Sequence, residues 1–180
     1  MTVGNPASTA PVGPGLAPLG GTPIVFANGT YQFFEIRRFA LPPGDETSDR
    51  HVLAALIGSP GYRGSFVGTG DEDPTIHGPY WAAAITADLF VPVSADDAET
   101  WLRTWAEYAT QLPKTVRAEV ESEVYARLQA ATSVYQLPTL PADANETEWR
   151  LGLGICAGFH EFVAIDRPQG VVTLVIATDD

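Results

Sequence analysis

The clearest alternation of hydrophobic and polar positions lies near the C-terminal end of the chain, in residues 148–178. Within 151–165 every odd-numbered residue is apolar except Glu161. This alternation predicts a β-strand with one face on a core. A turn at 166–170 then leads into 171–177, which is apolar on both faces. The second segment is therefore predicted to be a central strand that is covered on both sides.

The even-numbered face of the first of these strands is depleted of side chains. Gly152, Gly154 and Gly158 lie on it together with Cys156 and His160. Glycine inside a strand marks a bulge or the close approach of another backbone or of a ligand. Two interpretations remain open: the face lines a site that uses the cysteine and the histidine, or a helix or strand packs closely against it.

A second hairpin is predicted near the N-terminal end of the chain. Asn28 and Gly29 form the strongest short-range hairpin signal and separate two apolar runs, 23–27 and 30–39. A short helix is then expected from Ser48 or Asp49, and Gly58 is a plausible stop signal for it. A long strand is expected over 80–93, where odd-numbered residues are apolar and the opposite face is small.

Two consecutive helices are predicted in the middle of the chain. Ser94 is a capping residue followed by acids, and Pro113 separates the first helix from a second over 114–132. The first helix has an aromatic stripe at helical spacing: Trp101, Trp105, Tyr108 and Leu112. The second has an apolar line: Val116, Val120, Val124, Leu128 and Ala131. Stripes of this kind usually face a core, so we interpret both as buried surfaces.

These elements predict an α+β fold with a mostly antiparallel sheet and two consecutive helices on one face. A ferredoxin-like core extended at both ends is the first arrangement that the element order suggests. Residues 23–180 are expected to form a single domain. Residues 1–22 contain four prolines and five glycines and no charged residue, so an extended arm is expected there.

The charge and cysteine content narrow the range of functions. The formal net charge is −12, and the chain has only 10 Lys and Arg residues, which argues against binding nucleic acid through phosphate contacts. A basic protein partner suits an acidic surface, as does solubility alone. One cysteine excludes an internal disulfide framework. The sequence shows no membrane span and no signal-peptide pattern, so a cytoplasmic location is expected.

The most metal-like segment is an acidic loop at 70–78. Asp71, Glu72 and Asp73 bring three carboxylates together, and His77 follows them. Hard cations need several oxygen ligands from one flexible segment. The loop lacks the ordered ligand spacing of an EF-hand, however, and acidic loops of this kind are commonly exposed turns. The four residues are candidate metal ligands on these grounds, and no cofactor is expected.

An enzymatic site would have to use Cys156 and His160. The two residues share a strand face but lie about 13 Å apart along it, at about 3.3 Å per residue. A thiolate–imidazole pair needs hydrogen-bond contact, so a direct pair would require a bulge. Asp88, on the small face of the 80–93 segment, is a candidate polar partner in the same groove.

The chain contains no P-loop, no Gly-x-Ser-x-Gly elbow and no paired histidines. We therefore expect a non-enzymatic protein that binds another protein or itself, as a subunit of a larger assembly or as an acidic inhibitor or immunity-type partner. The alternative is a small α+β enzyme or ligand-binding protein whose groove contains Cys156, His160 and Asp88.

Overall fold

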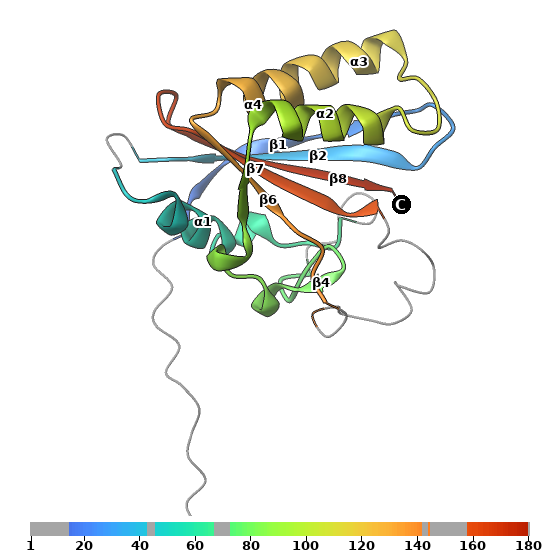
Figure 1. Cartoon of the computed structure of the whole chain (residues 1–180). Helices are drawn as coiled ribbons and strands as arrows, with labels where there is room; N and C mark the ends of the chain where they lie inside the picture. Colours follow the sequence, from blue (N-terminus) through green and yellow to red (C-terminus); the bar gives the residue numbers. More distant parts are fainter. Residues whose placement is uncertain (1–14, 43–45, 67–72, 142–143, 145–157, 180) are drawn as a thin grey trace, which may run out of the picture.

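The computed structural model describes residues 15–42, 46–66, 73–141, 144 and 158–179. It is an α+β fold in which a six-stranded antiparallel sheet, in the order β1-β2-β8-β7-β6-β5, carries helices on both faces (Figure 1). The strands of this sheet are β1 (Ala17–Val25), β2 (Gln32–Ala40), β5 (Val91–Val93), β6 (Ser133–Leu137), β7 (His160–Asp166) and β8 (Val171–Asp179). A small second sheet pairs β3 (Ile76–His77) with β4 (Tyr80–Trp81).

The helices fall into two groups. One face of the main sheet carries α1 (Asp49–Ile57) and the short 3₁₀ helices η1 (Pro60–Tyr62), η2 (Ala82–Ala84) and η3 (Ala87–Leu89). The other face carries α2 (Ala95–Ala106), α3 (Lys114–Val120) and α4 (Ala126–Ala130), with a π-helical segment η4 (Glu121–Tyr125) joining the last two. The predicted pair of helices on one face is therefore confirmed.

Both predicted hairpins are present, and they meet in the middle of the sheet. The first strand of the C-terminal hairpin, predicted to start at 151, begins at His160 in the described part of the chain, and residues 151–157 lie outside the described residues. In the N-terminal hairpin, Gly29 adopts a positive φ of 84°, and the Oδ1 of Asn28 accepts a hydrogen bond from the backbone N–H of Thr30 at 3.1 Å. In the C-terminal hairpin, β8 pairs with β7 on one side and with β2 on the other. The two hairpins thus become one sheet through the β2–β8 pair.

Strand β8 separates two hydrophobic cores. The first core lies between the sheet and the layer that contains α1. It includes Phe39, Leu53, Leu56, Val163, Leu174 and Ile176. The second core lies under α2, α3 and α4, and includes Phe34, Leu102, Val124, Leu128, Phe162, Val175 and Ala177. Adjacent residues of β8 enter opposite cores, as expected for a strand that is apolar on both faces.

The helix starts agree with the sequence prediction, but one helix end does not. Ser48 caps α1, and the Ser94 hydroxyl caps α2 by accepting from the Asp97 N–H at 3.0 Å. Helix α2 ends at Ala106, before the predicted Leu112. The side-chain amide of Gln32 donates to the carbonyl of Trp105 at 2.8 Å. In a longer helix that carbonyl would accept a hydrogen bond from the backbone N–H of residue 109. The contact with Gln32 therefore competes with the next helical turn.

The prediction of one long strand over 80–93 is wrong. The segment is divided into β4, η2, η3 and β5. The alanines between Trp81 and Asp88 offer little side-chain surface for cross-strand packing. Pro92 in β5 cannot donate to a ladder, and β5 accordingly lies at an edge of the sheet.

Two further expectations about topology and boundaries differ from the structure. A ferredoxin-like core joins strands through helical crossovers, whereas β5 and β6, which flank the helices α2–α4, are adjacent antiparallel partners. The sheet therefore lacks that core. Strand β1 begins at Ala17, within the range expected to be an arm, and residues 1–14 of that range lie outside the described residues.

Among the described residues, none of the helices combines the length and the apolar character required to cross a bilayer.

Candidate functional site

Three polar side chains form a buried network within the first core. The Tyr62 hydroxyl donates to Glu161 Oε1 at 2.9 Å, and His77 Nε2 lies 2.7 Å from Glu161 Oε2. His77 Nδ1 lies 2.7 Å from the Tyr62 carbonyl, which only accepts, so Nδ1 carries a hydrogen. The two rings stack at 3.8 Å. Relative exposure is 0% for Tyr62 and His77 and 1% for Glu161, so a substrate has no access to them.

This network explains the single charged residue on the predicted apolar face of β7. Both oxygens of Glu161 are paired, as a buried carboxylate requires. Burial and the nearby Glu161 charge raise the pKa of Tyr62 well above its usual value, so the hydroxyl keeps its proton. We interpret the network as a structural connection between η1, β3 and β7.

The candidate metal ligands of the acidic loop are placed as follows. Both ring nitrogens of His77 face protein oxygens in the buried network. Asp73 Oδ1 accepts from the N–H and the hydroxyl of Thr75, at 2.8 and 2.6 Å, and so closes a turn. Asp71 and Glu72 lie outside the described residues. In the part of the chain that is described, no group of three or more His, Cys, Asp or Glu residues is arranged to hold a metal ion.

The three residues of the predicted groove do not form one described site. Cys156 lies outside the described residues. Asp88 lies in η3 and forms an exposed ion pair with Arg50 of α1, on the side of the first core. His160 begins β7 and contacts tryptophans of α2, on the side of the second core. The sheet therefore separates Asp88 from His160.

His160 lies at the edge of an aromatic surface. Its ring centroid is 4.2 Å from that of Trp101 and 6.2 Å from that of Trp105. Strand β6 ends at Leu137, which pairs with Glu161, so His160 lies just beyond the end of β6. Burial lowers the pKa of His160 to about 4, and the ring is therefore neutral near pH 7.

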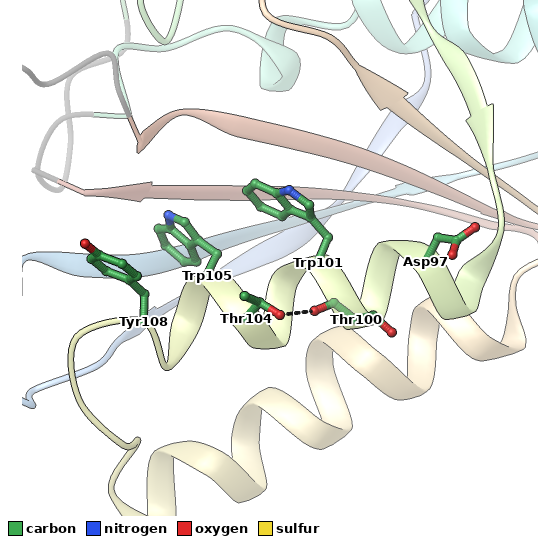
Figure 2. Close-up of a pocket in the computed structure, with 6 residues that line it drawn as sticks. All are labelled: Asp97, Thr100, Trp101, Thr104, Trp105 and Tyr108. Atoms are coloured by element: carbon green, nitrogen blue, oxygen red, sulfur yellow. Dashed lines mark hydrogen bonds between the residues drawn. The ribbon is translucent and has the colours of Figure 1, made fainter.

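An open apolar groove of about 430 Å³ runs along the side of α2 from which Trp101 and Trp105 reach the sheet. Figure 2 shows that its aromatic side chains project from the same side of the helix. The lining residues are Asp97, Thr100, Trp101, Thr104, Trp105 and Tyr108. Positions 97, 101 and 105 are spaced four apart, so their side chains lie along one line of the helix surface.

The aromatic stripe was predicted to be core, and the structure divides it between core and surface. Trp105 packs in edge or tilted contacts on Phe26 and Phe34 of the second core, with centroids 5.7 and 5.6 Å away. Trp101 and Trp105 are each only partly buried. Tyr108, which follows the helix end, is 86% exposed, so its predicted burial is wrong.

Ion pairs on another side of α2 hold the helix in place. Arg103 donates to both carboxylate oxygens of Glu121, at 2.6 and 2.7 Å, and to Glu99 at 2.7 Å. Its guanidinium lies 3.9 Å from the ring centroid of Tyr125. These contacts connect α2 to η4 and fix the helix that carries the groove. The Arg103 pair lowers the pKa of Glu121, which keeps that carboxylate charged.

The buried network gives the first prediction. Tyr62→Phe retains the ring stacking on His77 but removes the donor to Glu161 Oε1. A lost hydrogen bond to a buried charged group costs about 1.5–3 kcal/mol, so the free energy of unfolding in urea should fall by that amount. Tyr108→Phe is the matched control, because its hydroxyl is exposed, and should change stability by less than about 0.5 kcal/mol. Equal stabilities for the two variants would contradict the structural role.

The depressed pKa of His160 gives a second prediction. The unfolded state takes up a proton near pH 6.5, whereas the folded state does so only near pH 4. Stability should therefore fall as pH falls from 6.5 to 4. In His160→Phe, urea unfolding followed between pH 7 and pH 4 should show a shallower decline than in the parent chain. Parallel declines would show that His160 is not buried as a neutral ring.

Comparisons with protein-family models, with curated proteins and with solved structures found no match to this chain. The chemistry of the groove and the charge of the chain are therefore the basis for any functional proposal.

Proposed function

We propose that this chain is a non-enzymatic protein that binds another protein, and that the groove along α2 is its contact surface. The observation that carries the proposal is the aromatic row of the partly exposed Trp101 and Trp105 and the exposed Tyr108. Tryptophan and tyrosine are the residues most enriched among those that dominate binding energy at protein interfaces.

The groove is preorganised for binding. The Trp105 ring packs on Phe26 and Phe34 of the second core, and its backbone carbonyl accepts a hydrogen bond from the Gln32 side chain. The Arg103 ion pairs hold α2 from another side. Ordering side chains costs about 0.5–1.5 kcal/mol per flexible residue on association, and rings that are already held avoid much of that cost.

The sheet edges favour binding through side chains over binding by strand addition. Edge strand β1 contains Pro18 and Pro23, and its register shifts between Pro18 and Gly20. Edge strand β5 has only three residues, with Pro92 at its centre. Prolines and irregular edges hinder pairing with a further strand.

The enzymatic alternative has less support than the binding proposal. Asp88 lies on the opposite face of the sheet from His160, and the Tyr62–His77–Glu161 network is enclosed. The net charge of −12 favours a basic partner, as expected of an acidic inhibitor or immunity-type protein.

The test is site-specific photocrosslinking in the native cell. A photoreactive residue at position 108 should trap a partner protein. Position 81 is the control: Trp81 is also exposed, at 41%, but it lies in the layer on the other face of the sheet, so a photoreactive residue there should not trap the partner. With the trapped partner purified, Tyr108→Ala and Trp101→Ala should each weaken binding about 10- to 100-fold, while Trp81→Ala changes it less than about twofold.

Equal losses for Trp81→Ala and Trp101→Ala would contradict the placement of the contact surface. Light scattering of the purified chain, run in parallel, shows whether the trapped partner is a second copy of the same protein.

A further inference from the structure

We propose that the α2 groove recognises a cationic side chain, an arginine presented by a basic partner protein, which stacks on Trp101 and pairs with Asp97. This inference rests on the proposed function and specifies the chemistry of the partner. It follows from the groups that the groove presents, which are aromatic rings and a carboxylate.

Asp97 supplies a negative charge at one end of the groove. It lies one helical turn before Trp101, so the carboxylate and the indole are neighbours on the helix surface. Its Oδ2 accepts from the Ser94 hydroxyl at 2.6 Å, and Asp97 forms no ion pair with any described residue. Four other acids of the helical layer, Glu99, Glu107, Glu121 and Glu123, are each paired with an arginine.

The aromatic rings determine which cation fits best. Tryptophan offers the strongest ring face for cation–π contact. Guanidinium is planar, stacks on aromatic rings and can donate to a carboxylate at the same time, whereas the lysine ammonium is a compact and strongly hydrated charge. A ring face beside a carboxylate therefore suits arginine, and an anionic group would be repelled by both Asp97 and the net charge of the chain.

The experiment uses the full chain and two short probes, N-acetyl-leucyl-arginine amide and its citrulline analogue. Citrulline has nearly the shape of arginine but no charge. Binding is followed by NMR through the indole N–H signals of the tryptophans, assigned by substitution. The arginine probe should shift the Trp101 signal and bind about five- to tenfold more tightly than the citrulline probe, the sum of an exposed ion pair and an exposed cation–π contact.

Two substitutions in the first turn of α2 serve as a matched pair. Asp97→Asn should abolish the preference for arginine over citrulline. Asp96→Asn removes the same charge from the same helical turn, but Asp96 faces Gln129 of α4 at 3.0 Å, so the preference should persist. Because both variants alter the helix dipole alike, their difference isolates the contact of Asp97 with the probe.

Several outcomes would overturn the inference. Equal affinity for the two probes would show a groove without charge recognition and would leave the proposed function intact. Failure of the arginine probe to shift the Trp101 signal would reject arginine recognition, while the crosslinking test would still decide whether the groove binds a protein. Shifts of the same signals with protein concentration alone would identify a second copy as the occupant and would also reject it.

Discussion

Burial of β8 on both faces is the constraint on which the rest of the structure depends. The strand joins the N-terminal hairpin to the C-terminal one by pairing with β2 and β7. Its alternate side chains enter the two cores, so each face of the sheet must be covered by other elements. The layer that contains α1 covers one face, and helices α2–α4 cover the other (Figure 1). A strand with a polar face would not require the second layer.

The same constraint has different consequences for the two polar residues at the start of β7. Glu161 points into the first core, where a carboxylate is tolerated because Tyr62 and His77 satisfy it. His160 points to the side of α2, beyond the end of β6, and its neighbours are tryptophan rings. Of these adjacent residues, Glu161 thus serves stability, and His160 contacts the tryptophans of the candidate binding surface.

The candidate site was only partly predictable. His160 was identified because it lies on a strand face depleted of side chains, but its predicted companion Asp88 lies across the sheet. The tryptophans were found by their helical spacing and interpreted as core, and both do pack on the second core, although each stays partly exposed. Glu161 was visible as a charge in an apolar pattern, yet its partner His77 lies 84 positions away, and nothing local identifies that pair.

What the sequence determined by itself is local. Asn28 and Gly29 determined a hairpin, Ser48 and Ser94 determined helix starts, and the two-sided apolar run of β8 determined a central strand. Turn chemistry, capping and side-chain periodicity act within a few residues, so they can be read along the chain. Only the tertiary structure decided which aromatic rings stay exposed and where α2 ends. The helix ends where the Gln32 side chain of β2 donates a hydrogen bond to the Trp105 carbonyl in its last turn. Those outcomes depend on which distant surface lies opposite each residue, and periodicity carries no information about that.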